Sequence, residues 1–221
     1  MDLSQRKLIM GEQTLRGKIS AYKCNGASNH SDVEREINDF YATPDIATKP
    51  LIEYLKTNYP NIENEIVWEP ACGKGHICEV LKENGYNVIS TDLIDRGYRP
   101  GLYGENCDFL SEKNDYTTAH IITNPPYKFA QEFVEKAIDI MEDGKLCCML
   151  MKLTFLEGKK RYDMFQKYPP KHLLVFSNRI NCALGGDFET TPKLGGAVAY
   201  GWYIWEKGYT GKTMIEWIKA E

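Results

Sequence analysis

The sequence of 221 residues predicts an α/β protein with one mostly parallel sheet of seven strands and helices on both faces. Apolar and β-branched runs alternate along the chain with segments of helical periodicity. The run 145–152 is apolar at nearly every interior position, which is typical of a strand buried on both faces. Such alternation favours parallel pairing, because each crossover helix returns the chain to the same edge of the sheet.

The predicted elements follow from local signals. Residues 50–59 predict a helix that Pro50 begins, and residues 76–84 predict a second helix that Gly85 ends. Residues 130–141 carry apolar side chains at i, i+3 and i+4, and residues 158–167 form a basic helical stretch. A terminal helix is expected over 213–220. The predicted strands cover residues 65–68, 87–91, 107–110, 121–123, 145–152, 172–177 and 197–205.

Residues 1–30 predict a flexible N-terminal arm, because Gly, Ser, Asn and charged residues dominate there and no periodicity is sustained. A capping-box pattern at Ser31 and Glu34 then predicts a short helix through Asn38. Residues 31–221 are expected to form a single domain.

Composition excludes several classes of protein. Hydrophobic residues make up 43% and charged residues 26%, as in ordinary globular proteins, and no apolar run approaches the ~20 residues that cross a bilayer. The seven cysteines contain no CxxC pair, which favours a reduced, cytoplasmic protein over a disulfide-stapled one. The four histidines show no metal-ligand spacing, so no metal site is expected.

A glycine-containing turn and two acids follow successive predicted strands. Glu69-Pro-Ala-Cys-Gly-Lys-Gly75 follows the first strand, Asp92 the second and Asp108 the third. Ligands of open α/β sheets bind beyond the carboxyl ends of the strands, where Gly73 and Gly75 allow close backbone approach. Asp92 lies 92 − 69 = 23 residues after Glu69, close to the ~20-residue offset of an acid that binds ribose hydroxyls.

The acid at the head of this turn favours a cationic ligand. Glu69 would repel a pyrophosphate and attract the ammonium and sulfonium groups of S-adenosylmethionine. A dinucleotide and a purely structural turn remain as alternatives.

Asn124-Pro-Pro-Tyr127 follows the fourth predicted strand at the same edge. The prolines fix the turn and remove two backbone donors, which leaves the Asn124 side-chain oxygen and the Pro125 carbonyl as acceptors. Two acceptors beside the flat ring of Tyr127 suit an amino group on a π system, which would be aligned for attack on a methyl group.

With these motifs, the chain resembles the amino-group DNA methyltransferases of the N6-adenine type, in a small phage-like or prophage-like form with gamma-type motif order. The resemblance covers about residues 39–152 and implies a Rossmann-like class I methyltransferase fold with S-adenosylmethionine as cofactor. It assigns catalysis to Asn124, Pro125, Pro126 and Tyr127. It assigns cofactor binding to Tyr41, Thr43, Glu69, Ala71, Cys72, Gly73, Gly75, Asp92, Leu93, Asp108, Phe109 and Asn124. A bacterial or phage-infected host cell is the implied location.

The charge distribution locates a candidate surface for nucleic acid. The whole chain carries 27 − 31 = −4, but residues 151–193 carry eight basic and four acidic residues, hence +4, which leaves −8 for the rest. We expect DNA phosphates to contact Lys159, Lys160, Arg161, Arg179 and Lys193, although an ordinary solvated helix face is an alternative for the first three. Phe188, in a glycine-rich loop nearby, is a candidate for stacking.

Only 221 − 127 = 94 residues follow Tyr127, too few for a separate target-recognition domain, so strong sequence specificity is not expected. The predicted reaction is methylation of adenine N6 in DNA, on a flipped base or a single strand. Methylation of RNA adenine, methylation of a protein glutamine and a catalytically silent binding module are the alternatives.

Overall fold

The computed structural model describes residues 40–98, 106–111 and 116–221. The predicted arm over 1–30 and the predicted helix from Ser31 to Asn38 lie outside the described residues. Among the helices that are described, none is both long enough and apolar enough to cross a bilayer.

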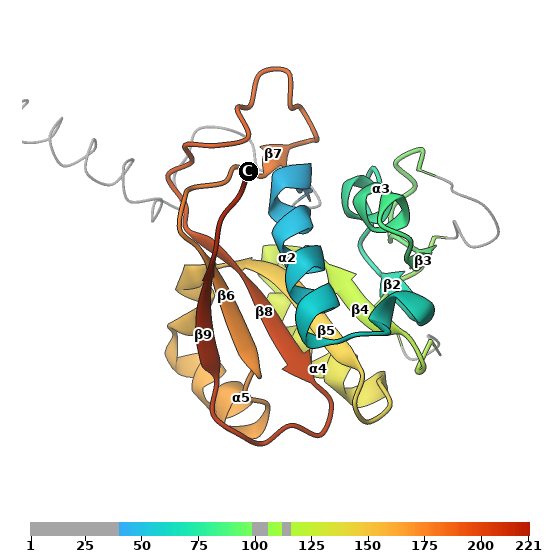
Figure 1. Cartoon of the computed structure of the whole chain (residues 1–221), viewed down its shortest axis with the longest axis vertical. Coiled ribbons are helices and arrows are strands. Elements are labelled where there is room, and N and C mark those ends of the chain that lie inside the picture. Colours follow the sequence, from blue (N-terminus) through green and yellow to red (C-terminus); the bar gives the residue numbers. More distant parts are fainter. Residues whose placement is uncertain (1–39, 99–105, 112–115) are drawn as a thin grey trace, which may run out of the picture. The chain divides into compact units, whose positions relative to one another are not determined.

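The described residues form a central sheet of seven strands in the order β3-β2-β4-β5-β8-β6-β9 (Figure 1). Its strands are β2 (Ile66–Glu69), β3 (Asn87–Ser90), β4 (His120–Thr123), β5 (Leu146–Lys152), β6 (His172–Phe176), β8 (Tyr200–Glu206) and β9 (Met214–Ile218). β3, β2, β4 and β5 are parallel neighbours, β8 runs antiparallel between β5 and β6, and β9 pairs in parallel with β6. The predicted mostly parallel, seven-stranded sheet is confirmed.

Helices cover both faces of this sheet, as predicted. α2 (Asp45–Asn58) and α3 (His76–Glu83) lie on one face, and α4 (Ala130–Ile140) and α5 (Tyr162–Lys167) on the other (Figure 1). A separate two-stranded sheet pairs β1 (Tyr41–Ala42) with β7 (Ala183–Leu184). Short 3₁₀ turns occupy Ile62–Asn64, Tyr127–Phe129, Leu153–Leu156 and Lys159–Arg161.

The start of α2 differs from the prediction. The helix begins at Asp45, directly after the extended Pro44, and Pro50 lies inside it. Asp45 in the first turn complements the partial positive charge of the helix N-terminus. Pro50 forfeits one intrahelical hydrogen bond, and the packing of its neighbours Leu51 and Ile52, which are almost fully buried, offsets that loss.

Two predicted elements are wrong. The predicted strand over 107–110 is a turn, because the Asp108 side chain accepts the Leu110 N–H at 3.0 Å; a single parallel bridge joins Asp92 to Asn106 instead. The predicted terminal helix over 213–220 is strand β9, because Met214–Ile218 pairs in parallel with β6 along its whole length.

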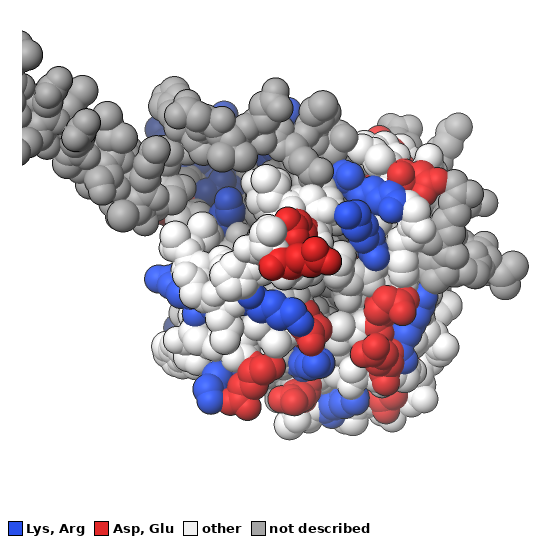
Figure 2. Space-filling model, turned by 90° about the horizontal axis from the view of Figure 1, so that it is seen from above, with Lys and Arg blue, Asp and Glu red and all other residues white. Residues whose placement is uncertain are grey.

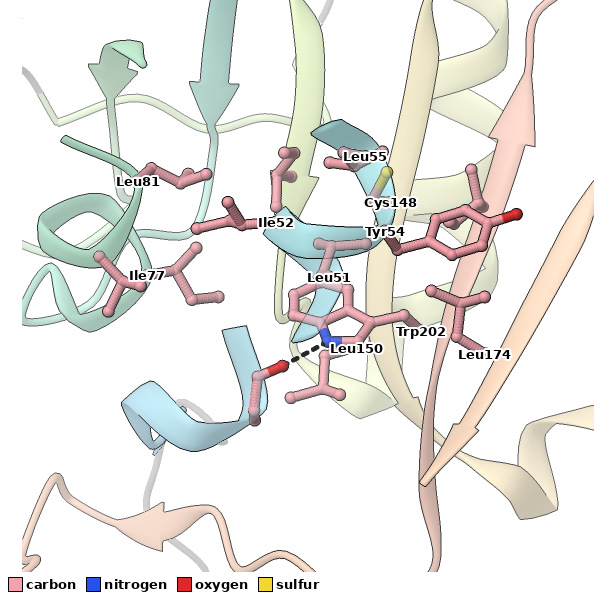
Figure 3. Packing of buried hydrophobic residues seen from close by; sticks show 14 of the residues in the cluster. Leu51, Ile52, Tyr54, Leu55, Ile77, Leu81, Cys148, Leu150, Leu174 and Trp202 are labelled. Carbon is pink, nitrogen blue, oxygen red and sulfur yellow. Dashed lines mark hydrogen bonds between the residues drawn. The ribbon is translucent and has the colours of Figure 1, made fainter. Parts of the chain in front are cut away.

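Two apolar cores lie on opposite faces of the sheet, because successive side chains of a strand point to opposite faces. Leu150 and Trp202 pack toward α2, and Met149 and Tyr203 pack toward α4. Trp202 is fully buried, and its indole N–H donates to the Ala47 carbonyl at 2.7 Å (Figure 3). This bond anchors α2 on the centre of the sheet and thereby fixes the segment that leads into it.

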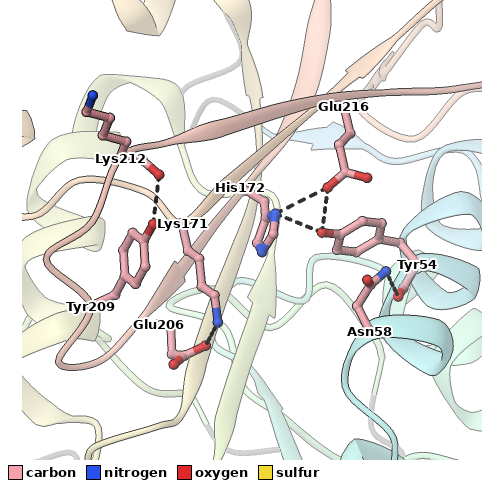
Figure 4. Close-up of polar contacts among 8 residues, drawn as sticks. All are labelled: Tyr54, Asn58, Lys171, His172, Glu206, Tyr209, Lys212 and Glu216. Atoms are coloured by element: carbon pink, nitrogen blue, oxygen red, sulfur yellow. Dashed lines mark hydrogen bonds and ion pairs between the residues drawn. The ribbon is translucent and has the colours of Figure 1, made fainter.

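Polar contacts hold the edge strand β9. The Tyr54 hydroxyl donates to Glu216 Oε1 at 2.9 Å and lies 2.8 Å from His172 Nδ1, which joins α2, β6 and β9 (Figure 4). Burial lowers the pKa of His172 below its usual 6.5, so the imidazole is neutral at neutral pH. Beside it, Lys171 pairs with Glu206 at 2.6 Å.

Candidate active site

The predicted site residues meet at the edge formed by the carboxyl ends of the parallel strands. The glycine turn follows β2, Asp92 follows β3, Asn124 follows β4 and Lys152 ends β5. These strands are direct neighbours in the sheet, so the four features lie side by side.

Hydrogen bonds tie the glycine turn to the end of β3. The Gly73 N–H donates to Asp92 Oδ2 at 2.8 Å, and the Ile94 N–H donates to Asp92 Oδ1 at 2.9 Å. The Cys72 N–H also donates to the Thr91 carbonyl at 3.0 Å. Asp92 is only half-buried, so its oxygens retain acceptor positions for a hydroxyl ligand.

The turn requires glycine at two positions. Gly73 and Gly75 have φ angles of 56° and 81°, in the left-handed region. A Cβ atom on Gly73 would stand 2.2 Å from the Phe40 ring, and a Cβ atom on Gly75 would stand 2.2 Å from the Tyr98 ring. The two aromatic rings therefore rest directly against the turn.

Glu69 lies beneath this turn and is 2% exposed. The Cys78 thiol donates to Glu69 Oε2 at 2.6 Å. Burial raises the pKa of Glu69 to about 8, so the carboxyl holds a proton at neutral pH when no cation is nearby. A cation bound beside it would favour the ionised carboxylate, and the cationic ligand expected from the sequence stays a prediction.

Asn124 has a fixed side-chain orientation. Its amide nitrogen donates to the Tyr41 carbonyl at 3.0 Å and to the Thr43 hydroxyl at 3.1 Å. Since a backbone carbonyl only accepts hydrogen bonds, the nitrogen and not the oxygen must face Tyr41. Asn124 Oδ1 is buried and has no hydrogen-bond partner among the described residues. Buried polar atoms are rarely left unpaired, so this oxygen is an acceptor positioned for a ligand.

Tyr127 lies in a cluster of rings beside Asn124. Its ring stacks on Tyr41 with centroids 5.8 Å apart and lies 6.2 Å from the Tyr200 ring. The Lys152 ammonium lies 4.8 Å from the Tyr127 ring centroid. Burial raises the pKa of Tyr127 well above 10, so the phenol stays protonated and donates to Cys182 Sγ.

A segment from the last part of the chain joins this site. β7 pairs Leu184 with Tyr41, and the Lys74 ammonium donates to the Gly185 carbonyl at 2.9 Å. Phe188, a candidate for stacking on bases, packs edge-on against His76 with ring centroids 5.3 Å apart. The segment 183–188 thus contacts both the glycine turn and strand β1, whose Tyr41 carbonyl orients Asn124.

The other predicted cofactor residues lie in different environments. Ala71 is half-buried, Leu93 is 61% exposed, and Asp108 is exposed at the turn after the bridge. Phe109 is only 2% exposed and packs between Trp68 and Phe133, with ring centroids 5.1 and 4.7 Å away. The Phe109 side chain is part of the core. We therefore expect only the Phe109 backbone and the neighbouring Asp108 to be able to contact a ligand.

The residues predicted to contact phosphates differ in their exposure and in their hydrogen-bond partners. Lys159 and Lys160 are exposed, whereas the Arg161 guanidinium donates to the carbonyls of Phe155, at 2.8 Å, and Glu157. Lys193 pairs with Asp45 at 2.6 Å, and this bond lowers the pKa of Asp45 to about 2.

Arg179 is exposed. Figure 2 shows one surface of the molecule, and on the described part of that surface basic and acidic side chains are interspersed.

Three residues near the site were missed by the sequence analysis. Arg96 and Tyr98 line the small pocket between Gly73 and Asp92, and Lys152 lies at the Tyr127 ring. Lys152 could have been found from the sequence, because it is the last residue of a predicted strand whose end faces this edge. Arg96 and Tyr98 lie in an irregular segment where the sequence pattern gives no direction for a side chain.

Comparisons with known proteins find similarity in structure but not in sequence. No family model matches the chain, and no curated protein matches it in sequence. It resembles a proposed class I S-adenosylmethionine-dependent methyltransferase from Listeria monocytogenes, with 12% identity and a TM-score of 0.53 over 94% of this chain and 72% of the other. It also resembles a proposed RNA methyltransferase from Pyrococcus horikoshii, with 18% identity and a TM-score of 0.56 over 81% and 90%.

A third similar structure is the M protein of the type I restriction enzyme EcoKI, with 16% identity and a TM-score of 0.58. The match covers 91% of this chain but only 51% of that protein, so the chain spans about half of its length. With the strand order and helix placement described above, these likenesses identify the fold as the Rossmann-like class I methyltransferase fold.

Proposed function

We propose that the protein is an S-adenosylmethionine-dependent methyltransferase that transfers a methyl group to N6 of adenine in DNA. The observation that carries the proposal is Asn124 Oδ1, which is buried, has no partner among the described residues, and is held in place at the carboxyl edge by the two hydrogen bonds that the Asn124 amide nitrogen donates. Because this acceptor is already fixed in position, no free energy is needed to reorient it when an amino group binds.

The cofactor residues fit a cationic nucleoside. Glu69 lies beneath the turn for the ammonium group, and Asp92 keeps acceptor positions for ribose hydroxyls beside Gly73. S-adenosylmethionine supplies a methyl group on a sulfonium, whose departure as a thioether drives the transfer.

The catalytic turn then acts on the amino group of the substrate. Asn124 Oδ1 and the Pro125 carbonyl accept its two N–H bonds, which draws the nitrogen lone pair out of conjugation with the ring. The lone pair is thereby directed in line with the bond that breaks. The N–CH₃ bond would form as the S–CH₃ bond breaks, the thioether would leave, and the methylated nitrogen would then release one proton to solvent. The Tyr127 ring lies beside this position for contact with the base, and Lys152 is close enough to steady the ring or a nearby phosphate.

The choice of nucleic acid as the substrate rests on exposed charge beyond β5. Lys159 and Lys160 are exposed after β5, where phosphates of a strand entering this edge would pass. Similar structures include proteins named for DNA and for RNA modification. RNA adenine and protein glutamine therefore stay as alternative acceptors in the test.

The test supplies methyl-labelled cofactor together with unmethylated DNA, RNA or a protein extract. We expect label in N6-methyladenine of DNA, and we expect Asn124→Ala to lower the transfer by about 100-fold or more, since the acceptor is lost. Asn178→Ala is the matched control: Asn178 is also half-buried, but it bonds Ala220 at the far end of the chain. Label only in RNA or only in protein would favour the corresponding alternative, and no label in any acceptor would contradict catalysis.

A further inference from the structure

The small pocket beside the glycine turn is lined by one basic side chain, Arg96, to which no role has yet been given. The guanidinium carbon of Arg96 lies 4.4 Å from the centroid of the Phe40 ring. Phe40 in turn covers Gly73, whose N–H is bonded to Asp92. Arg96 therefore lies over the glycine turn, next to the position expected for the ribose.

Charge distinguishes Arg96 from the rest of the pocket. Among the ten described residues that line it, Arg96 is the only basic one, against the two acids Asp92 and Asp95. Both acids accept backbone N–H bonds, Asp92 from Gly73 and Ile94 and Asp95 from Gly97. Their charges are partly compensated by these amides.

One donor of Arg96 is available. Its Nε atom is buried and has no hydrogen-bond partner among the described residues. A guanidinium that stacks on an aromatic ring keeps its edge free for a planar anion, and carboxylates fit that edge with two parallel hydrogen bonds. The unpaired donor thus points to an anionic ligand group in a pocket otherwise suited to a cation.

From these contacts we infer that Arg96 binds the α-carboxylate of the methionine portion of the cofactor. This inference rests on the proposed function. The amino-acid end of the cofactor is a zwitterion, and Arg96 is the basic side chain among the described residues of this pocket that can pair with its carboxylate. Such a pair would select a complete amino acid over a plain nucleoside.

Two ligands that differ in a single group test this role by calorimetry. S-adenosylhomocysteine has the carboxylate, and S-adenosyl-3-thiopropylamine lacks only that group. We expect the wild type to bind the first at least about 10-fold more tightly, as a charge-assisted bidentate pair should give. We expect Arg96→Met to lose that preference by weakening only the first ligand, and Arg96→Lys to keep part of it.

Lys56→Met is the matched control, because it also replaces one positive charge, but Lys56 is exposed and bonds the Asn84 side chain outside the glycine turn. The preference should survive in it. Near-ultraviolet circular dichroism and melting temperature verify that each variant is folded. Equal weakening of both ligands by Arg96→Met would overturn the inference, as it would show that Arg96 only packs on Phe40. Loss of the preference in Lys56→Met alone would also overturn it. A wild-type protein that binds neither ligand would instead contradict the proposed function.

Discussion

The Thr43 hydroxyl accepts a 3.1 Å hydrogen bond from the side-chain amide of Asn124. Thr43 is 3% exposed and precedes α2, whereas Asn124 follows β4, so the bond joins two segments 81 residues apart. Together with the bond to the Tyr41 carbonyl, which sets the orientation of the amide, it limits rotation of the Asn124 side chain.

Replacing Thr43 tests that arrangement. In Thr43→Val the amide keeps only the Tyr41 carbonyl as an acceptor, so Asn124 rotates more freely and the turnover number should fall about 10-fold at saturating cofactor. Thr43→Ser restores the hydroxyl and should recover most of the rate. Equal loss in the two variants would show that the methyl group of Thr43, not its hydroxyl, is what matters.

Gly73→Ala should abolish cofactor binding, because its Cβ would meet the Phe40 ring at 2.2 Å and push it out of place. Gly85→Ala is the matched control, since its φ is also positive, at 89°, but no atom lies within 4 Å of the added methyl. Both variants should lose about 1–2 kcal/mol of stability from the left-handed backbone, measured by denaturant unfolding. Calorimetry should show binding lost only in Gly73→Ala, and equal binding in the two would contradict the role of the turn.

The buried Glu69 predicts a pH dependence of stability. Its folded pKa of about 8 lies above the ordinary 4.5, so the folded state keeps a proton that the unfolded state releases. This contribution is fully present below pH 4.5 and is lost as the pH rises through 8, at a slope of up to about 1.4 kcal/mol per pH unit.

Urea unfolding between pH 5 and pH 8, without cofactor, measures this effect. Glu69→Gln cannot ionise and should remove the decline with pH that the wild type shows. His120 and His172, whose pKa values burial lowers, change stability in the opposite direction in both proteins, so the difference between the two curves isolates Glu69. Parallel curves would refute the assignment.

Tyr54→Phe should destabilise the protein by about 1–3 kcal/mol, because it leaves His172 and Glu216 without their shared hydroxyl. Tyr59→Phe is its control. The Tyr59 ring also contacts His172, but its buried hydroxyl has no partner among the described residues, so its removal should be neutral or slightly stabilising. Chemical denaturation compares the two, and a larger loss in Tyr59→Phe would be inconsistent with the network.

Much of the site could be predicted because strand ends are recognisable in sequence. Glu69 ends β2, whereas Asp92 and Asn124 follow β3 and β4, and parallel pairing brings such strand ends together. The contact of Tyr41 with Leu184 could not be predicted, since a two-residue pairing between distant segments leaves no periodic signal. Arg161 was predicted to be a free surface charge. Its hydrogen bonds to backbone carbonyls depend on the turn at Gly158, which has a φ of 117°, and the sequence does not indicate that turn.

Strand β9, at the edge of the sheet, is a second element that could not be predicted from the sequence. Met214–Ile218 has too few residues to separate helical from strand periodicity, and Glu216 interrupts its apolar run. Only the neighbouring β6 and the Tyr54 hydroxyl, which lies far away in sequence, determine that this segment is a strand.

The insertion of β8 between β5 and β6 has a consequence for the order of assembly. β6 precedes β8 in the chain but has no neighbour among the earlier strands, so a ribosome must deliver Tyr200–Glu206 before the two parts of the sheet can join. Until then β5 presents an open, strongly apolar edge, which is the kind of surface that chaperones shield and that drives aggregation. The nascent protein is therefore most vulnerable late in synthesis, when β2, β4 and β5 have long been made but β8 has not yet covered the edge of β5.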